Sequence, residues 1–383
     1  MGTTSIAIVG AGLSGLYAAY LLEQQGIRNY MLLEARARTG GRIVSASFTE
    51  APLAAEAASN DFNRFDLGAA WFWPDLQPRL DRLVTHLGLE RFEQYEEGDM
   101  LVERTPHDPP LRMRGYASSP RAMRLKGGMG ALIAALQRTL TPGRLVTGRN
   151  VRQVRRMERH IELDAEDAQG RFSTHRAAAV LLAIPPRLAT ATIEFVPALP
   201  SALWRGWTDT ATWMAPHAKY VAVYDASFWR DRGLSGEARS AVGPLAEIHD
   251  ASMPGGDAAL FGFLGLPART RGRLSDDELR KQCRAQLARM FGAQASHPRV
   301  EIVKDWAEDP LTATGSDRDV GPEHPAAPAA MAESGVWRHV LIGVASEWSL
   351  RFPGYVAGAI DAASTGMSAL PGLASFDAIA AHR

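Results

Sequence analysis

The stretch SIAIVGAGLSGLYAAYLLEQQGIRNYMLLEARARTGGR, from Ser5 to Arg42, decides the fold of this chain. Residues 6–9 (IAIV) predict a short buried strand, and the apolar periodicity of residues 13–25 predicts a helix directly after it. The apolar residues 30–33 predict a second strand. A strand, a glycine-rich turn, a helix and a strand in this order are typical of a Rossmann-like parallel sheet that binds a dinucleotide.

Three glycines in G-x-G-x-x-G register connect the first strand to the helix. Gly10 permits the tight turn, Gly12 lets a pyrophosphate approach the backbone, and Gly15 lets the helix pack closely on the strand. The helix N-terminus offers free N–H groups and the positive end of its dipole to the phosphates. Glu34 ends the second strand, where an acidic residue holds the ribose and repels the 2′-phosphate of NADP. The ligands expected from this unit are Gly10, Ala11, Gly12, Leu13, Ser14, Gly15 and Glu34.

The composition is that of a globular protein without a nucleic-acid partner. The 383 residues are 46% hydrophobic, which is enough for a large core and two domains. Lys plus Arg and Asp plus Glu both number 42, so no basic field attracts nucleic acid. The single cysteine, Cys283, excludes disulfides within the chain and fits a reducing cytoplasm. The sequence contains neither histidines at metal-site spacing nor a run of about 18 apolar residues, so we expect no metal site and no membrane span.

The residues that follow the second strand carry a resemblance to a known family. The run E-A-R-x-R-x-G-G-R, from Glu34 to Arg42, resembles the N-terminal signature of the FAD-dependent amine oxidases, whose relatives include protoporphyrinogen oxidases and carotenoid desaturases. The resemblance implies that Glu34 holds the adenosine ribose of FAD and that the Gly-Gly-Arg loop lies against its pyrophosphate and flavin. Arg42 can neutralise a diphosphate that the glycines allow to come close. Nothing matches the cysteine that some members bond to the flavin, so we expect noncovalent FAD.

Further blocks resemble the same family. Residues 65–71 (FDLGAAW) resemble its D-x-G-x-x-W segment beside the flavin, and Val151 matches a valine that meets the adenine. Residues 340–347 and 352–360 resemble its last cofactor motif, in which Glu347 contacts the ribityl chain and the next helix points at the flavin pyrimidine. The ligands that the resemblance adds are Ala35, Arg36, Gly41, Arg42, Gly68, Ala69, Ala70, Trp71, Val151, Glu347 and Val356.

These blocks predict an α/β chain with two domains. A Rossmann-like FAD-binding domain is expected from residues 1–75, 125–195 and 335–383, with a parallel sheet that is discontinuous in sequence. An α+β substrate-binding domain with a mixed sheet is expected from residues 76–124 and 196–334. Within it, a helix in residues 76–89 begins a cap over the cofactor domain, residues 105–120 form a loop, and a capping box at Ser275 starts a helix that buries Cys283.

The resemblance also implies a substrate site, with three candidate catalytic residues. Tyr355 matches one of two aromatic residues that flank the substrate nitrogen in the family, and the position of the second falls near Asp317. Trp306 opens a W-A-E-D-P segment that resembles the family's W-x-x-D-P. The family usually keeps a lysine linked through water to flavin N5. Alignment by eye puts Met253 in its place and matches Lys219 to a different family position, which predicts slow reoxidation by oxygen.

These features predict an FAD-dependent oxidoreductase that removes a hydride from the carbon next to nitrogen in an amine or amino-acid-like molecule. Oxygen would reoxidise the flavin and give H2O2, because no second G-x-G-x-x-G follows a strand to hold NAD(P)H. One alternative is a dehydrogenase or desaturase acting on C–C bonds of a ring or polyene, favoured by the missing lysine and the half-built aromatic pair. Another is a flavin-binding protein whose catalysis has decayed, which the complete FAD motifs oppose.

Overall fold

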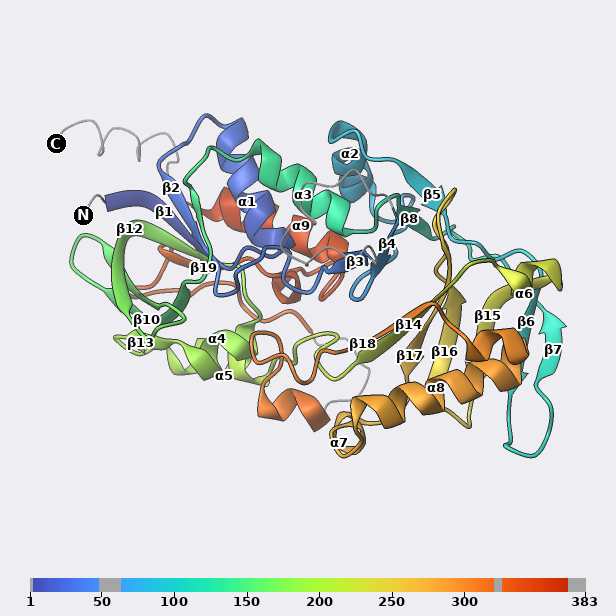
Figure 1. Ribbon diagram of the computed structural model, residues 1–383. Helices are drawn as coiled ribbons and strands as arrows, with labels where there is room; N and C mark the ends of the chain where they lie inside the picture. Colours follow the sequence, from blue (N-terminus) through green and yellow to red (C-terminus); the bar gives the residue numbers. More distant parts are fainter. Residues whose placement is uncertain (1–2, 48–62, 320–325, 371–383) are drawn as a thin grey trace.

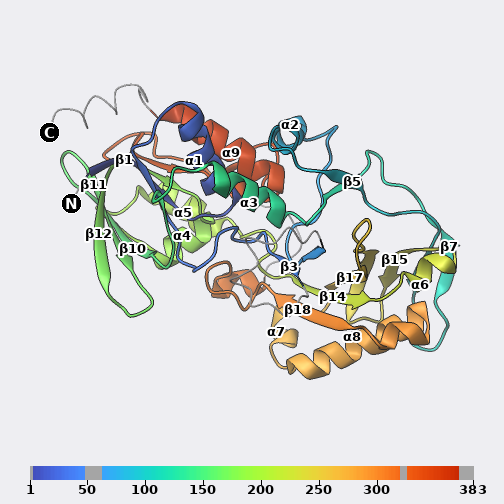
Figure 2. The same ribbon diagram turned by 45° about the horizontal axis from the view of Figure 1, so that its top comes forward.

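The structure, a computed structural model, describes residues 3–47, 63–319 and 326–370 (Figure 1). Two large sheets organise these residues, and each is assembled from segments that are far apart in sequence. The first sheet and its helices lie at one end of the molecule, and the second sheet lies at the other (Figures 1 and 2).

The first sheet grows outward from the unit predicted at the N-terminus. β1 (Thr3–Val9) pairs in parallel with β2 (Tyr30–Leu33) on one side and with β12 (Phe172–Leu182) on the other. The strand order is β13-β10-β11-β12-β1-β2-β9, and β19 also pairs with β12. β10, β11 and β12 are antiparallel, so the expected parallel arrangement is confirmed around β1 and an antiparallel extension follows it. The other strands are β9 (Leu145–Val146), β10 (Asn150–Arg156), β11 (Ile161–Glu166), β13 (Glu194–Val196) and β19 (Leu341–Gly343).

Helices cover both faces of the first sheet, with α1, α3 and α9 on one face and α4 and α5 on the other (Figure 1). Ile6 and Ile8 pack into the core beneath α1, whereas Ala7 and Val9 pack into the core beneath α5. Successive strand residues point to opposite faces, so a strand covered on both sides is apolar at every position. These helices are α1 (Leu13–Gln24), α3 (Gly130–Thr139), α4 (Pro186–Thr192), α5 (Ser201–Asp209) and α9 (Val356–Ala369), and a further helix, α2 (Pro78–His86), packs on α9.

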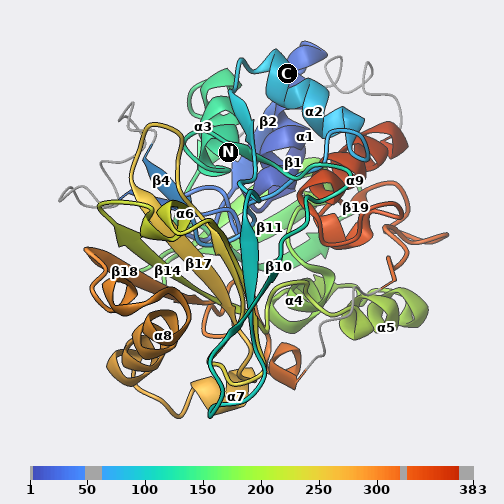
Figure 3. The ribbon, with the colours of Figure 1, turned by 90° about the vertical axis from the view of Figure 1, so that its right-hand side faces the viewer.

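The second sheet has the order β18-β14-β17-β16-β15-β6-β7. Only β15 and β6 pair in parallel, so the predicted mixed sheet is confirmed. The helix α8 (Asp276–Phe291) runs along one face (Figure 3), and Lys219 and Phe263 line a cavity on the other. The strands are β6 (Asp99–Glu103), β7 (Leu111–Arg114), β14 (Ala218–Tyr224), β15 (Leu234–Ser240), β16 (Leu245–Asp250), β17 (Ala258–Leu264) and β18 (Val300–Asp305).

The helix α8 begins as its sequence predicts. The Ser275 hydroxyl accepts a hydrogen bond from the Glu278 backbone N–H at 3.2 Å, which satisfies one of the free donors at the helix N-terminus. Cys283 is fully buried in the core between α8 and the sheet, where burial raises its pKa to about 12. The thiol is therefore neutral and structural.

The remaining elements are short. Two antiparallel pairs, β3 with β4 and β5 with β8, form separate two-stranded sheets. These elements are β3 (Ser45–Ser47), β4 (Arg64–Asp66), β5 (Arg91–Glu93), β8 (Met123–Leu125), α6 (Phe228–Asp231), α7 (Ala268–Arg271) and the 3₁₀ turns Ala293–Ser296, Gly315–Asp319 and Ser346–Trp348. In the described part of the chain, no helix combines the length and the hydropathy that crossing a bilayer requires.

Two local expectations differ from the structure. Residues 105–120, expected as a loop, contain β7. All four side chains of β7 are exposed, so the sequence lacks the alternation of apolar and polar residues that marks a half-buried strand. The helix α2, expected to begin a cap, instead packs Leu80, Leu83 and Val84 into the core shared by α1 and α9. The expected domain bounds stay a prediction, although they assign α2 and α5 to the substrate-binding domain while α2 packs on α9 and α5 packs on the first sheet.

Candidate functional site

A cavity of about 1070 Å³ is lined by residues of both sheets. The glycine turn after β1 lines one end, and β14, β17 and Trp306 line the other. Pockets for small ligands measure roughly 300–1,000 Å³, so this cavity has room for a dinucleotide and a small substrate together.

The glycine turn leaves open space where a phosphate group would approach. Gly10 has φ +102°, and a Cβ there would lie 2.8 Å from the carbonyl oxygen of Ala183. A Cβ on Gly15 would lie 1.9 Å from the Gly10 oxygen, because α1 packs directly on the turn. A Cβ on Gly12 would meet nothing closer than the Gly40 oxygen at 4.0 Å. Gly12 is also the N-cap of α1 without a side-chain cap, so the first N–H groups of the helix are available to an anion.

Glu34 lies at the cavity wall after β2 and is only 3% exposed. Its Oε2 accepts a hydrogen bond from the Ala11 backbone N–H at 2.7 Å, and its Oε1 accepts one from the Arg36 N–H at 2.9 Å. These two donors fix the carboxylate and leave further lone pairs for ribose hydroxyls. Arg36 is itself held by Asp309, with Nη2 2.8 Å from Oδ1.

Arg42 connects the glycine loop to the C-terminal motif. Its Nη1 and Nη2 donate to Glu347 Oε1 and Oε2 at 2.6 and 3.0 Å, a bidentate pair. The same guanidinium donates to the Ser346 hydroxyl at 3.2 Å and to the Trp213 carbonyl at 3.0 Å. Glu347 is fully buried and does not line the cavity. Its carboxylate therefore acts on the cavity through Arg42.

These residues fit an adenine dinucleotide. An open glycine cradle at a helix N-terminus suits the pyrophosphate, an oriented carboxylate suits the ribose, and an arginine stands beside the cradle. Arg149, Asn150 and Val151 line the cavity on the same side of the molecule as Glu34. If FAD lies here, Glu34 holds the ribose, and Gly12, Ser14 and Arg42 hold the diphosphate.

A buried lysine stands at the other end of the cavity. Lys219, on β14, is 1% exposed, and its Nζ donates to the carbonyl oxygens of Gly68 at 2.7 Å and Asp66 at 3.1 Å. The nitrogen lies 4.4 Å from the ring centroid of Phe261. The pKa of Lys219 is lowered to about 7, mainly by burial, with Asp66 raising it and Arg124 lowering it. The ammonium is thus charged below pH 7 and loses its charge above it.

The D-x-G-x-x-W segment is fixed against this lysine. Trp306 donates from Nε1 to the Leu67 carbonyl at 3.1 Å, between the two carbonyls that Lys219 holds. A Cβ on Gly68 would lie 1.9 Å from the Arg42 oxygen, so the segment also packs directly on the glycine loop. Trp71 donates from Nε1 to Gln94 at 2.8 Å. The segment therefore joins the cofactor end of the cavity to its substrate end.

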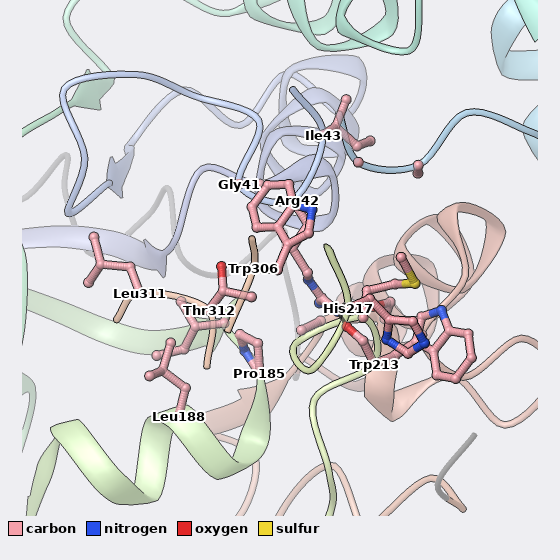
Figure 4. Close-up of a pocket in the computed structure, with 18 of the residues that line it drawn as sticks. Gly41, Arg42, Ile43, Pro185, Leu188, Trp213, His217, Trp306, Leu311 and Thr312 are labelled. Atoms are coloured by element: carbon pink, nitrogen blue, oxygen red, sulfur yellow. Dashed lines mark hydrogen bonds between the residues drawn. The ribbon is translucent and has the colours of Figure 1, made fainter. Parts of the chain in front are cut away.

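Aromatic side chains surround the substrate end. Tyr355, the N-cap residue of α9, lines the cavity with its ring 6.4 Å from that of Trp73, measured between centroids. Trp213 and His217 lie side by side next to Arg42 (Figure 4), with ring centroids 5.5 Å apart. Such walls bind apolar groups and attract cations at their faces.

The structure brings most of the expected site residues to one cavity. Those that line it are Gly10, Gly12, Leu13, Ser14, Glu34, Ala35, Arg36, Gly41, Arg42, Gly68, Ala69, Ala70, Trp71, Val151, Trp306, Tyr355 and Val356. Ala11 and Gly15 are buried beside the cavity, where they act through the backbone.

Two further expected site residues do not line the cavity: Glu347, which reaches it only through Arg42, and Met253. Met253 is buried in a cluster with Phe65, Val221 and Phe261 and does not line the cavity. Lys219 does line it. The alignment by eye that gave Met253 the lysine's place is therefore not supported by the geometry, because a residue outside the cavity cannot position a water within it.

Sequence reasoning missed several lining residues. Lys219 carried a usable signal, since it is the only charged residue in a strand that is otherwise apolar and aromatic, AKYVAVY, and the structure buries every position of that strand. Trp213 and His217 lie in the segment between α5 and β14, where no periodicity marks them. The expected aromatic partner of Tyr355 is absent at Asp317, which is fully buried and does not line the cavity. Across the described residues, no cluster of His, Cys, Asp and Glu could hold a metal ion.

Two family models match this chain. The model of the family "Flavin containing amine oxidoreductase" matches residues 93–365, and that of the NAD(P)-binding Rossmann-like domain matches residues 8–87. A probable flavin-containing monoamine oxidase A of Dictyostelium discoideum is 24% identical over 405 residues, covering 79% of this chain and 84% of the relative. A putrescine oxidase of Kocuria rosea is 31% identical over 163 residues, covering 39% of this chain and 32% of the relative.

Solved structures share the fold. A putrescine oxidase bound to putrescine has a TM-score of 0.77 at 20% identity, covering 96% of this chain and 98% of that one. The cyclohexylamine oxidase from Brevibacterium oxydans IH-35A has a TM-score of 0.76 at 18% identity, covering 98% of this chain and all of that one. The family match extends over more than half of the sequence and includes both the lysine strand and the C-terminal cofactor motif. The chain therefore belongs to the flavin containing amine oxidoreductase family and is an FAD-dependent oxidoreductase.

Proposed function

We propose that this enzyme oxidises the C–N bond of an amine or amino-acid-like small molecule and passes the electrons to O2. The substrate loses a hydride from the carbon next to nitrogen and a proton from the nitrogen, so the C–N single bond becomes the C=N double bond of an imine. O2 takes up the two electrons and two protons as H2O2, and water then hydrolyses the imine. The observation that carries the proposal is the continuity of one cavity from the dinucleotide cradle to a buried lysine and a set of aromatic walls. The names of the relatives, monoamine, putrescine and cyclohexylamine oxidases, support an amine substrate.

The chain's own residues orient the substrate and keep its amine neutral. Bound FAD supplies the hydride acceptor, and the chemistry of that acceptor is the cofactor's own. A neutral amine is required because the nitrogen lone pair assists the departure of hydride. The positive charge of Lys219 below pH 7 disfavours an ammonium ion at this end of the cavity.

Two features of the chain stabilise negative charge at the substrate end. The N-terminus of α9, at Tyr355 and Val356, lines the cavity and presents the positive end of a 14-residue helix. Lys219, rather than Met253, supplies the positive charge that favours electron transfer to oxygen. FAD is held noncovalently, because the only cysteine is buried beneath α8.

The test is anaerobic reduction followed by exposure to oxygen. Primary amines, diamines and amino acids are added one at a time to the anaerobic holoenzyme, and the flavin absorbance near 450 nm is followed. We expect at least one amine to bleach the flavin and oxygen to restore it with one H2O2 per turnover. Bleaching only by a polyene or ring substrate would favour C–C dehydrogenation. Failure of every substrate would favour decayed catalysis.

A further inference from the structure

The family resemblance predicts two aromatic residues at the substrate site, and the sequence has an aromatic residue, Tyr355, at only one of the two matching positions. Tyr355 lines the cavity, but Asp317 stands where the partner of Tyr355 was expected and lies outside the cavity. We propose that Trp213 is the second aromatic side chain that contacts the substrate amine, and that Asp317 is a positioning residue that holds the Trp213 loop in place. The inference rests on the proposed amine oxidation and names the residues that bind its substrate.

Trp213 lines the cavity next to the backbone that carries Tyr355. A Cβ on Gly354 would lie 2.5 Å from the Trp213 Cβ and 2.7 Å from its Cγ, so the indole packs directly on the backbone that precedes Tyr355. The absence of a Cβ on Gly354 leaves room for this contact, and its φ of +80° is a conformation that glycine adopts without strain. Both Trp213 and Tyr355 line the cavity. Two aromatic side chains from distant segments thereby reach the cavity at the start of α9.

Arg42 ties the Trp213 backbone to the cofactor cradle. Its Nη1 donates to the Trp213 carbonyl at 3.0 Å, and the same guanidinium forms an ion pair with Glu347. This hydrogen bond is to the backbone carbonyl, so it fixes the position of the Trp213 backbone and does not involve the ring. A substitution of the Trp213 side chain should therefore leave the hydrogen bond intact.

Asp317 holds the same loop from the other side. Its Oδ1 accepts a hydrogen bond from the Thr212 backbone N–H at 3.0 Å and pairs with Arg187 Nη1 at 2.8 Å. Its Oδ2 accepts from the backbone N–H and the hydroxyl of Thr314, both at 2.8 Å. The carboxylate is fully buried with these partners. The residue at the expected aromatic position therefore anchors the loop that brings a different aromatic residue into the cavity.

The backbone of this loop is held under strain. Met214, directly after Trp213, has φ +67°, a conformation that side-chain-bearing residues rarely adopt. Such a conformation persists only where the surroundings hold it. Here the two anchors lie on the residues immediately before it, Thr212 and Trp213. The strained backbone therefore indicates that these two anchors hold the loop in the conformation that places Trp213 in the cavity wall.

The first experiment measures binding of a cation that cannot be oxidised. Benzyltrimethylammonium chloride is titrated into the FAD-loaded enzyme by calorimetry, because an indole face attracts a quaternary ammonium and the attraction needs no turnover. Trp213→Leu should weaken binding roughly 3- to 30-fold and raise KM for the best amine more than it lowers kcat. Trp213→Phe, which keeps a ring, should lose less than about threefold. Trp204→Leu, at a half-exposed tryptophan on α5 outside the cavity, should bind the probe as the parent does.

The second experiment tests the anchor through the residue it positions. Asp317→Asn should weaken probe binding in the parent background, because the loop loses its charged tie to Arg187. In the Trp213→Leu background the same substitution should have no further effect on the probe. If Asp317 served only the stability of the fold, Asp317→Asn would weaken probe binding equally in the parent and in the Trp213→Leu enzyme. That result would overturn the positioning role of Asp317.

The outcomes separate this inference from the function on which it rests. If the parent oxidises amines and binds the probe but Trp213→Leu binds it equally well, Trp213 is not the second wall. Loss of FAD from Trp213→Leu with unchanged probe affinity in Asp317→Asn would likewise overturn the inference, since the ring would then serve the cofactor. If the parent oxidises no amine, the proposed function fails whatever the variants do.

Discussion

The two ends of the cavity are built in different ways. The cofactor end is made mainly of backbone: the open turn at Gly12, the start of α1 and a carboxylate on Glu34 held by two N–H groups. The substrate end is made of side chains, with Lys219, Trp306 and Trp213 each contributed by a different segment. A dinucleotide needs the first kind of site, because its phosphates are recognised by N–H groups and close approach. A small amine needs shaped walls and a placed charge.

This difference determines how far each end tolerates change. The cofactor end depends on a few contacts that no side chain can replace, so one added methyl group can disrupt it. The substrate end depends on many side chains, each of which contributes a fraction of the binding energy. We therefore expect the effects of substitution to fall from the turn at Gly15, through Lys219, to the apolar cluster around Met253.

The largest effect is expected for Gly15→Ala. The new Cβ would lie 1.9 Å from the Gly10 oxygen and 3.1 Å from the Ala183 Cβ, so α1 must move away from the turn that it supports. We expect a loss of about 3 kcal/mol in the free energy of unfolding and loss of most bound FAD. Urea unfolding measures the first, and the flavin absorbance that remains after gel filtration measures the second.

A matched control is available in another helix. Gly206 lies in α5, where a Cβ would meet only the Pro328 Cβ at 3.8 Å, an ordinary contact. Gly206→Ala should leave FAD bound and should be neutral or stabilising, because alanine is the better helix former by roughly 1 kcal/mol. If Gly15→Ala behaved like this control, the close approach of α1 to the turn would not be required for the cofactor site.

The same difference explains how much of the site the sequence could predict. Gly10, Gly15 and Glu34 were identifiable because turn, helix and strand follow one another within Ser5–Arg42, and their spacing alone fixes their geometry. The strands around β1 were identifiable from apolar periodicity for the same local reason, whereas the mixed sheet was expected from the family resemblance. Trp213 could not be found in this way. Its place in the cavity depends on Arg42 and Asp317, which lie 171 and 104 positions away, and no local pattern encodes such contacts.

The next effect in size concerns Lys219 and pH. Because burial lowers the pKa of Lys219 to about 7, its positive charge is present below pH 7 and lost above it. If this charge favours electron transfer to oxygen, the rate of flavin reoxidation should fall as the pH rises through about 7. Lys219→Met should remove this pH dependence and slow reoxidation at pH 6 roughly tenfold. Stopped-flow mixing of the reduced enzyme with oxygen measures the rate.

Lys281→Met provides the control for that experiment. Lys281 is an exposed residue on α8, outside the cavity, so its substitution should leave the rate and the pH profile as in the parent. A Lys219→Met enzyme that retained the parent's pH profile would show that another group carries the charge. Asp66 and Arg124, the two groups that influence the Lys219 pKa besides burial, would then be examined first.

The smallest effect is expected at Met253. Its size tests whether Met253 takes the place of the family's lysine, as the sequence alignment suggested, or lies outside the site, as its position in the structure indicates. Met253 packs among Phe65, Val221 and Phe261, so Met253→Leu is a volume-conserving change that should cost less than about 1.5 kcal/mol of stability. Both half-reactions should stay within about twofold of the parent, because the side chain does not line the cavity. Met253→Lys should instead place an unpaired charge in an apolar core, lowering stability without speeding reoxidation. A change of more than about fivefold in the oxygen rate of Met253→Leu would contradict this and return the residue to the site.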